Sequence, residues 1–398
     1  MDTQAKRLPK TVLLITDHDG LYGANRSLFD LAQFFKNHTS VTPIVLIQRA
    51  GLLSQALTAI GVENHCVLFR KWCFLPGGEK RFAFLRRCAD AAMRWRIYRL
   101  MKGKGVELVH TNISTTQVGD YLAQKLHVPH VWYVREFVPE AFPYRFNRSP
   151  AFVAKCFGRA DAVVTISKAL QASFQRKYPA ANVEMIYNGV NLPYGEKRFQ
   201  PVPTVRFCCV GRLCPQKNQM RILQALLLLK KAGKPFHMHF YGTGSDRAYE
   251  DSLYETVRTG GLSDCVTFHG YSPRVVEELA GYDVGLVMSV YEAFGRTTIE
   301  FMNASMPVIG AASGATPELI ENGEDGLICP PDDPQALADA MARFIDQPAL
   351  IERMGQRAHA KAGERFSCER SFEQVCALYA RCLAARSTKE SGEGNGRR

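Results

Sequence analysis

The chain has 398 residues, of which 46% are hydrophobic and 22% are charged, and its formal net charge is +12 at pH 7. This length exceeds one ordinary hydrophobic core and predicts two domains, while the composition excludes a disordered or fibrous protein. The longest uninterrupted apolar runs, such as 225–229, are far too short to cross a bilayer, and residues 1–10 lack the apolar core of a signal peptide. We therefore expect a cytoplasmic protein.

The twelve cysteines are scattered and form no CxxC pair. Two of them, Cys208 and Cys209, lie within a run that is typical of a strand. Buried free thiols in a reducing compartment are the interpretation that fits this distribution. No cluster has the spacing of zinc ligands, so the sequence predicts no metal site.

Positive charge is concentrated between Arg70 and Lys104, where eleven Lys and Arg residues face only two acidic ones, a net charge of +9. Such a stripe favours an anionic partner, namely a membrane surface, a pyrophosphate-bearing lipid or a nucleic acid. The alternative is a solvated basic face on the helix predicted over 81–101, whose other face packs on a sheet. Trp72 and Trp95 nearby favour a helix that lies on anionic lipid.

Apolar runs alternate with helical periodicity from end to end, which predicts an α/β fold with parallel sheets. The first run, 11–16, is followed by a glycine-bearing loop and an amphipathic helix that carries Leu28, Leu31 and Phe35. The remaining strands predicted in the N-terminal half are 41–47, 107–110, 130–134 and 162–166. The proline-rich stretch 192–203 is the predicted linker, which gives an N-terminal domain of 1–191.

The pattern restarts after the linker and predicts a second domain of 204–368. Its expected strands are 205–210, 237–241, 266–269, 284–288, 308–310 and 327–329. Helices are expected from Pro334 and Leu350, with Asp333 as a helix N-cap. We predict a C-terminal helix over 369–386 that packs back toward the N-terminal domain, and a disordered tail over 387–398 because that segment has almost nothing apolar to bury.

A loop that begins at Gly211 follows the first strand of the second domain and opens a helix. Gly211 permits a tight turn, and Arg212 and Lys217 can place two positive charges on one diphosphate. Fixed cations there would stabilise the negative charge that develops on a departing nucleoside diphosphate. Read alone, the two residues are more often ordinary surface cations, and it is the second motif downstream that favours the functional interpretation.

The stretch 283–326 carries the second constellation. Glu292 and Glu300 bracket a turn and the first turn of a helix that opens near Gly295. Backbone N–H groups at a helix N-terminus bind phosphate, and carboxylates beside it can bind hydroxyls. The arrangement indicates a nucleotide-sugar site.

Together, the GRL…KN loop and the E-A-F-G-x-x-x-x-E segment resemble family four of the retaining glycosyltransferases, also called group 1. The resemblance covers most of the chain and is strongest over 205–334. It implies the GT-B fold, in which two Rossmann-like domains face each other across a cleft. It also implies catalytic roles for Arg212 and Lys217 on the donor diphosphate and for Glu292 beside the donor sugar.

The resemblance further implies a donor site in which Glu300 binds the ribose hydroxyls and Gly23 approaches the β-phosphate. The complete predicted donor set is Gly23, Gly211, Gly242, Gly244, Tyr271, Phe294, Gly295 and Glu300. For Gly242, Gly244 and Tyr271 a purely structural role is an equal alternative. The acceptor-side candidates are His110, Arg135 and Glu136; His110 could instead be a packing residue.

The sequence departs from the family pattern at Arg135, which stands where many members have a histidine. Arginine cannot act as a base near neutral pH, so Arg135 would bind a phosphate or a sugar hydroxyl instead. No DxD-like pair occurs in a suitable loop, so we predict metal-independent departure of the leaving group and no cofactor.

The resulting prediction is a retaining hexosyltransferase, peripheral on the inner face of the cytoplasmic membrane. It would use a UDP or GDP type of sugar donor and a lipid-linked O-antigen, capsule or lipopolysaccharide intermediate as acceptor. The alternatives are a GT-B phosphorylase or nucleotide-sugar epimerase, or a protein that binds a nucleotide sugar or nucleic acid without catalysis. No nucleic-acid motif is present, so no nucleic-acid partner is expected.

Overall fold

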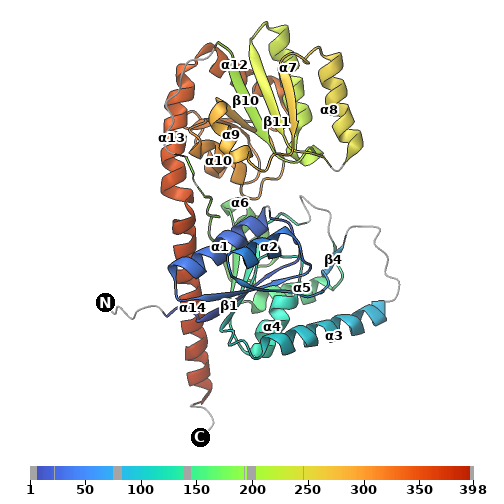
Figure 1. Cartoon of the computed structure of the whole chain (residues 1–398), viewed down its shortest axis with the longest axis vertical. Helices are drawn as coiled ribbons and strands as arrows, with labels where there is room; N and C mark the ends of the chain where they lie inside the picture. The colour runs from blue at the N-terminus through green and yellow to red at the C-terminus, as the bar shows by residue number, and fades with distance from the viewer. Residues whose placement is uncertain are drawn as a thin grey trace. The chain divides into compact units, whose positions relative to one another are not determined.

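The computed structural model describes residues 7–21, 23–74, 83–138, 145–191, 193–194, 203–244 and 246–394, with the side chains of 83–89 and 389–394 left out. The chain divides into two compact units (Figure 1). The first comprises Met1–Gly189 with Cys368–Arg398, and the second comprises Val190–Ser367. The predicted linker lies mostly outside the described residues.

The first unit is built on a parallel sheet of seven strands in the order β3-β2-β1-β5-β6-β8-β9. The strands are β1 Thr11–Thr16, β2 Thr42–Ile47, β3 Glu63–Cys66, β5 Leu108–Thr111, β6 His130–Val134, β8 Ala162–Thr165 and β9 Val183–Met185. The five strands expected from apolar runs are confirmed, and the short edge strands β3 and β9 are additional. An antiparallel pair, β4 Cys73–Phe74 and β7 Arg145–Phe146, accompanies this sheet.

Helices link and cover the strands of the first unit. They are α1 Ala24–His38, α2 Leu52–Ala59, α3 Ala83–Met101, α4 Val118–Leu126, α5 Pro150–Arg159, α6 Lys168–Lys177 and α14 Cys368–Gly394. The predicted apolar face of α1 is confirmed, because Leu28, Leu31 and Phe35 are buried. Burial of this face, rather than intrinsic helix propensity, stabilises such a helix.

The C-terminal helix α14 packs on α1 within the first unit (Figure 1). The rings of Phe34 and Phe372 lie 5.1 Å apart, and Tyr379 packs on Phe35 at 5.8 Å. The prediction of a disordered tail from residue 387 is wrong as far as Gly394, where α14 ends. Ser387 and Thr388 donate hydrogen bonds to backbone carbonyls one turn earlier, which is how polar side chains are accommodated in a helix.

The second unit is built on a parallel sheet of six strands in the order β12-β11-β10-β13-β14-β15. The strands are β10 Val205–Val210, β11 Phe236–Tyr241, β12 Val266–Gly270, β13 Val284–Val287, β14 Val308–Ala311 and β15 Gly326–Cys329. The helices are α7 Gln219–Lys231, α8 Arg247–Thr259, α9 Val275–Glu278, α10 Arg296–Asn303, α11 Thr316–Leu319, α12 Pro334–Asp346 and α13 Ala349–Phe366. All six predicted strands are confirmed, and the Asp333 carboxylate caps α12.

The two sheets share one topological feature that fixes where ligands bind. In each sheet the strand order reverses beside the first strand, between β1 and β5 in the first unit and between β10 and β13 in the second. In open parallel sheets the crevice at the carboxyl end of such a switch point is the ligand-binding position. Two Rossmann-like units are therefore confirmed.

The basic stripe is only partly a free surface. Trp72, expected on a lipid-facing surface, is 1% exposed and stacks on Trp132 at 5.4 Å, so this part of the prediction is wrong. Its indole N–H donates to the Ser114 carbonyl, which fixes it in the core. Trp95, in contrast, is 55% exposed on α3. Lys80, Arg81 and the side chains of Arg86 and Arg87 lie outside the described residues.

The described cysteines are all free, as the sequence predicts, and five of them are buried. Cys66 is exposed, which the prediction of buried thiols did not anticipate. Over the described ranges of the chain, every helix is too short or too polar to cross a membrane.

Packing between α10 and α13 depends on a close backbone approach at Gly355. A Cβ there would lie 2.1 Å from the Ser305 carbonyl oxygen, so Gly355→Ala should destabilise the protein by about 1–3 kcal/mol. Gly363 on the same helix has open space around it, and Gly363→Ala should stabilise by up to about 1 kcal/mol. Urea unfolding of both variants checks this; equal effects would contradict the packing described here.

Candidate functional site

In the second unit, the loop after β10 runs beside the switch point and carries Arg212 and Lys217. Gly211 has a φ of 155°, and residues Pro215–Lys217 form a 3₁₀ turn. Asn218 follows in the left-handed region with a φ of 61°, and its side chain donates to the Pro331 carbonyl at 2.6 Å. This bond, together with the packed face of α7, fixes the end of the loop.

Lys217 and Glu292 form an ion pair between the loop after β10 and the loop after β13. Lys217 Nζ donates to Glu292 Oε2 at 2.8 Å, and the two side chains are 35% and 15% exposed. Burial alone would lower the pKa of Lys217, but the charge and hydrogen bond of Glu292 raise it. The ammonium therefore stays charged beside the N-terminal end of α10.

Neighbouring backbone groups fix the loop that carries Glu292. Val290 N–H donates to the Gln216 carbonyl at 3.0 Å, and the Glu292 carbonyl accepts from Ala315 N–H at 2.8 Å. Gly314, with a φ of 57°, allows the segment around it to pack closely against the Glu292 loop, because a Cβ there would lie 2.4 Å from the Glu292 carbonyl oxygen. The carboxylate of Glu292 is thus mounted on a loop held from both sides.

The helix that the sequence predicts near Gly295 begins at Arg296. Gly295 has a φ of 96°, which favours glycine, and no side chain caps the helix. Glu300, one turn later, accepts from Arg296 Nε at 3.0 Å and is 14% exposed. Phe294 is buried, so only its backbone could reach a ligand.

Arg212 and Tyr271 lie at the surface of the second unit. The Arg212 side chain is exposed and, within the described part of the chain, makes no hydrogen bond or ion pair. Its carbonyl accepts from Gln219 Nε2 at 2.9 Å, which fixes the backbone while the guanidinium stays in solvent. Tyr271 is 75% exposed.

Gly242 and Gly244 have a structural role that the sequence left as an alternative. A Cβ on Gly242 would lie 2.1 Å from the Gly211 carbonyl oxygen, and one on Gly244 would lie 2.9 Å from the Leu213 carbonyl oxygen. Leu213 N–H also donates to the Thr243 carbonyl at 3.2 Å. These glycines let the loops after β10 and β11 pack backbone to backbone.

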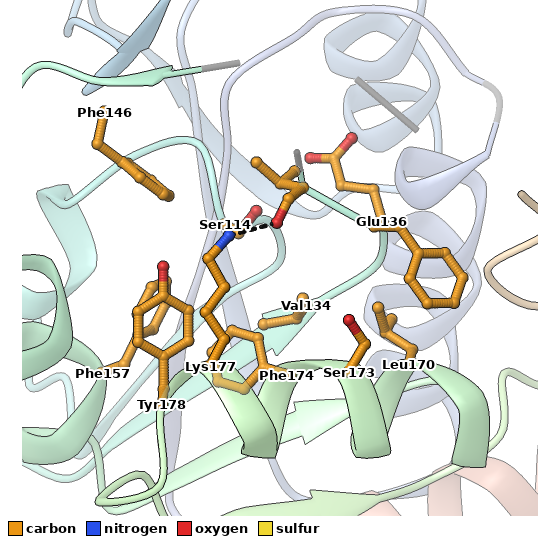
Figure 2. Close-up of a pocket in the computed structure, with 12 residues that line it drawn as sticks. Ser114, Val134, Glu136, Phe146, Phe157, Leu170, Ser173, Phe174, Lys177 and Tyr178 are labelled. Atoms are coloured by element: carbon orange, nitrogen blue, oxygen red, sulfur yellow. Dashed lines mark hydrogen bonds between the residues drawn. The ribbon is translucent and has the colours of Figure 1, made fainter. Parts of the chain in front are cut away.

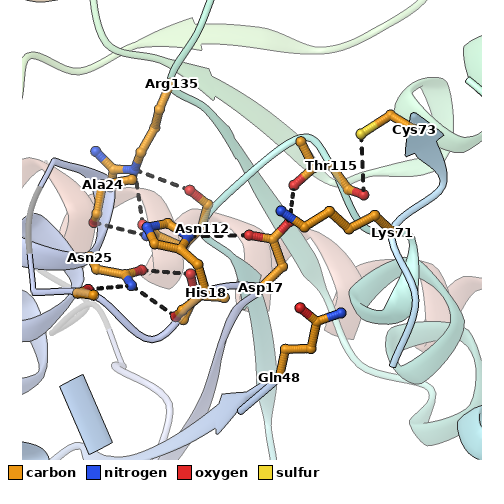
Figure 3. A network of polar contacts seen from close by, with 12 residues as sticks. Asp17, His18, Ala24, Asn25, Gln48, Lys71, Cys73, Asn112, Thr115 and Arg135 are labelled. Atoms are coloured by element: carbon orange, nitrogen blue, oxygen red, sulfur yellow. Dashed lines mark hydrogen bonds and ion pairs between the residues drawn. The ribbon is translucent and has the colours of Figure 1, made fainter. Parts of the chain in front are cut away.

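In the first unit, the switch point carries a polar network around Asp17, at the end of β1 (Figure 3). Asp17 is 3% exposed and pairs with Lys71 Nζ at 3.1 Å. Thr115 donates to the same carboxylate, and His18 Nδ1 lies 3.2 Å from it. Burial alone would raise the pKa of Asp17, but these partners lower it.

Two asparagines hold the loops around this network (Figure 3). Asn25 accepts from Thr16 and donates to the carbonyls of His18 and Gly20, while Asn112 donates to the Ala24 carbonyl at 2.9 Å. The loop ends at Gly23, which has a φ of 53° and open space where a Cβ would stand. A ligand could approach that backbone closely.

Arg135 is held by uncharged oxygens. Its Nε donates to Asn112 Oδ1 at 2.9 Å and its NH1 donates to Asn188 Oδ1 at 2.5 Å. The guanidinium also lies over the Tyr133 ring, 4.6 Å from its centroid. The side chain that replaces the usual histidine is therefore oriented at the end of β6.

His110 lies in the core and favours the packing role that the sequence left open. It is completely buried, stacks on Tyr133 at 4.5 Å, and its Nδ1 lies 2.5 Å from the Tyr379 hydroxyl. Burial and the charges of Arg135 and His130 hold the pKa of His110 well below its usual value. The imidazole is therefore neutral.

Glu136 lines an apolar pocket beyond β6, together with aromatic residues such as Phe157 and Phe174 (Figure 2). Lys177 Nζ donates to the Val138 carbonyl at 2.7 Å. Burial raises the pKa of Glu136, and the charge of Asp17 adds to that effect. The acceptor-side candidates Arg135 and Glu136 thus follow β6, whereas His110 belongs to the interior.

Sequence reasoning missed Asp17, Lys71, Thr115 and Asn25. Asp17 directly follows a predicted strand, and a polar residue at that position is a signal that could have identified it. Lys71 had been assigned to a membrane-facing stripe, and nothing in the local sequence indicates that it pairs with a residue at the end of β1.

The two sheets define a Rossmann-like fold, and comparison with known proteins identifies the family to which the chain belongs. The model for "Glycosyl transferases group 1" matches residues 196–361, and the model for "Glycosyltransferase Family 4" matches residues 22–193. The chain belongs to the family-four, group 1 glycosyltransferases, whose fold class is GT-B.

Among curated relatives, the lipopolysaccharide core biosynthesis mannosyltransferase LpsB of Rhizobium meliloti is 28% identical over 56% of this chain and 66% of its own length. The N-acetyl-alpha-D-glucosaminyl L-malate synthase of Bacillus anthracis is 31% identical over 32% of this chain and 34% of its own. The matches therefore span less than two thirds of these relatives.

Solved structures share the fold over nearly the whole chain. Anabaena HepE in complex with UDP superposes with a TM-score of 0.75 at 20% identity, covering 92% of this chain and 98% of that one. The sucrose-phosphate synthase of Thermosynechococcus elongatus superposes with a TM-score of 0.74 at 20% identity, covering 94% of this chain and 100% of that one. At these identities the likeness shows the fold alone.

The Asp17 network predicts that the stability of the protein depends on pH. Because the folded-state pKa of Asp17 is lowered, its carboxylate stabilises the protein above the ordinary pKa of 3.8, and that contribution is lost as the pH falls through the folded value. Asp17→Asn should lower the free energy of unfolding by about 1.5–3 kcal/mol at pH 7. The difference in unfolding free energy between this variant and wild type should shrink below about pH 4.

Urea unfolding across pH 3–7 measures this difference. Asp19→Asn is the matched control, because no hydrogen bond of the Asp19 carboxylate occurs within the described residues. A difference between Asp17→Asn and wild type that stays constant with pH would contradict the charged network.

Proposed function

We propose that this protein is a retaining glycosyltransferase that moves a hexose-type sugar from a nucleoside diphosphate donor to a glycan acceptor. The observation that carries the proposal is the Lys217–Glu292 ion pair at the switch point of the second sheet, beside the N-terminus of α10. Family membership and the fold shared with a UDP complex support a nucleotide-sugar donor.

The donor diphosphate would lie against Lys217 and Arg212. The Lys217 ammonium has three N–H donors, of which Glu292 takes one, so two can bind phosphate oxygens. Arg212, exposed on the same loop, would add a second positive charge. Glu300 on the first turns of α10 would accept hydrogen bonds from the ribose, and the backbone at Gly295 would face the phosphate.

Catalysis would then be mainly electrostatic. The bond from the anomeric carbon to the diphosphate oxygen breaks as the bond to the acceptor hydroxyl forms on the same face, and the hydroxyl proton passes to the leaving diphosphate. Lys217 and Arg212 stabilise the charge on the diphosphate without a metal ion, and Glu292 stabilises the positive charge on the sugar. Front-face attack accounts for retention.

The acceptor would be bound by the first unit, near Arg135 and Glu136. Relatives named as lipopolysaccharide core mannosyltransferases support a lipopolysaccharide, O-antigen or capsule intermediate as the acceptor class. Exposed Trp95 and the basic residues of α3 would place the protein on the inner face of the cytoplasmic membrane. Sedimentation with anionic but not neutral vesicles is the test of that location.

Lys217→Ala should lower turnover by about 10²–10³, the effect of losing one preorganised charge partner in the transition state. Lys231→Ala, at the exposed far end of α7, is the matched control and should leave turnover unchanged. The assay is sugar transfer with and without EDTA; activity that collapses with EDTA and returns with Mg²⁺ would contradict the proposed role of the fixed cations.

Glu292→Gln should lower turnover far more than it weakens binding of the nucleoside diphosphate alone, because its charge acts on the sugar in the transition state. Calorimetry and transfer assays on the same preparation separate these effects, and Glu321→Gln on an exposed loop is the control. Full turnover with a lowered melting temperature would show that Glu292 only stabilises the loop.

A further inference from the structure

A small pocket of the first unit shares no residue with the predicted donor set and is unused in the mechanism above. It is formed by the chain at 69–71, by α3 and by the start of α4. The residues that line it and matter here are Arg70, Lys71, Asp90, Arg94, Gln117 and Val118. Because α4 follows β5, the pocket lies near the carboxyl end of the switch-point strands.

Three cations converge on the pocket against one lining carboxylate. Arg70 Nε lies 3.4 Å from Asp90 Oδ1, and Arg94 Nε donates to the Asp90 backbone carbonyl at 3.2 Å. The Arg94 guanidinium also lies over the Tyr121 ring, 5.3 Å from its centroid, which fixes its orientation. Lys71 reaches the same pocket while bonded to Asp17. The local charge suits an anion.

The N-terminus of α4 adds a partial positive charge to these cations. The helix has nine residues, and its N-cap, Gln117, makes no side-chain capping bond. A helix N-terminus carries unsatisfied N–H groups and a partial positive charge that favour anions. Val118, the first helical residue, lines the pocket, so this end of the helix faces it, although the Val118 N–H itself donates to Thr116 Oγ1 at 3.3 Å.

Gln117 supplies an independent observation that points to a ligand. Its side chain lines the pocket and is 8% exposed, yet its amide makes no hydrogen bond within the described residues. The Gln117 amide is not among the solvent-shielded polar atoms without a partner in the described residues, so it keeps contact with the space of the pocket. An amide N–H₂ beside three cations is a donor placed for an anionic oxygen.

We infer that this pocket binds a phosphate or diphosphate group carried by the acceptor. The assignment of the group to an acceptor rests on the proposed function, whereas binding of the anion itself does not. A phosphate offers several oxygens to Arg70, Lys71, Arg94, the Gln117 amide and the helix N-terminus at once. The acceptor class is then a phosphate-bearing or diphosphate-bearing glycan intermediate.

Calorimetry with inorganic pyrophosphate tests the pocket directly. Arg94→Gln should weaken binding about tenfold or more, while Arg96→Gln, an exposed arginine on the same helix outside the pocket, should leave it unchanged. Lys217→Ala separates this pocket from the donor diphosphate site and should keep the Arg94-dependent binding. Pyrophosphate binding that is lost in Lys217→Ala and unaffected by Arg94→Gln would overturn the inference.

Gln117→Met gives a readout that a purely structural role would not produce. It keeps the size of the side chain and removes an amide that makes no hydrogen bond within the described residues, so the melting temperature should change little while pyrophosphate binding weakens several-fold. A lowered melting temperature with unchanged pyrophosphate affinity would show that Gln117 supports the fold only, and would overturn its role as an anion donor.

Two further arms identify the source of the phosphate. Phosphatidylcholine vesicles with and without phosphatidic acid are compared with pyrophosphate in solution. Arg94-dependent binding to the phosphatidic acid vesicles assigns the pocket to a lipid-borne phosphate, and Arg94-dependent binding to pyrophosphate alone assigns it to a soluble one. If no sugar transfer is found but Arg94-dependent binding to pyrophosphate or to the phosphatidic acid vesicles persists, the anion-binding pocket is supported and the transferase proposal fails.

Discussion

The ion pair between Lys217 and Glu292 is the interaction on which the proposed donor site depends. The two side chains come from loops 75 residues apart in the chain, and the 2.8 Å contact joins the ends of β10 and β13 where the sheet order reverses. Gly211, Gly242 and Gly314 allow the close backbone approaches that bring the loops together. A preorganised cation and carboxylate can stabilise opposite charges in one transition state without reorganising.

The sheet of the first unit has the same reversal of strand order, but different side chains lie at its switch point. Its switch point carries Asp17, buried and held by Lys71, Thr115 and His18, and the loop beyond it reaches Gly23. Arg135 is fixed by two asparagines nearby. The polar residues there are strongly oriented, which is what the proposed acceptor site would need in order to select one hydroxyl or one phosphate.

The sequence predicted the inner strands of both sheets because apolar β-branched runs signal strands buried on both faces. It missed β3, whose residues Glu63–Cys66 are mostly polar, because edge strands lack that signal. The two motifs and the family resemblance singled out Lys217 and Glu292 as candidates, but they did not predict that the two side chains pair. Local sequence carries no signal for a contact between residues 75 positions apart. Trp72 was misassigned for the same reason: its partner Trp132 lies far along the chain.

A double-mutant cycle on turnover tests the central claim most directly. If Lys217 and Glu292 act as one unit, the double variant Lys217→Ala with Glu292→Gln should be little slower than the slower of the two single variants. Sugar transfer under saturating donor, measured on wild type, both single variants and the double variant, gives the coupling. Rate losses that multiply would show that the two residues act independently, and would contradict the account.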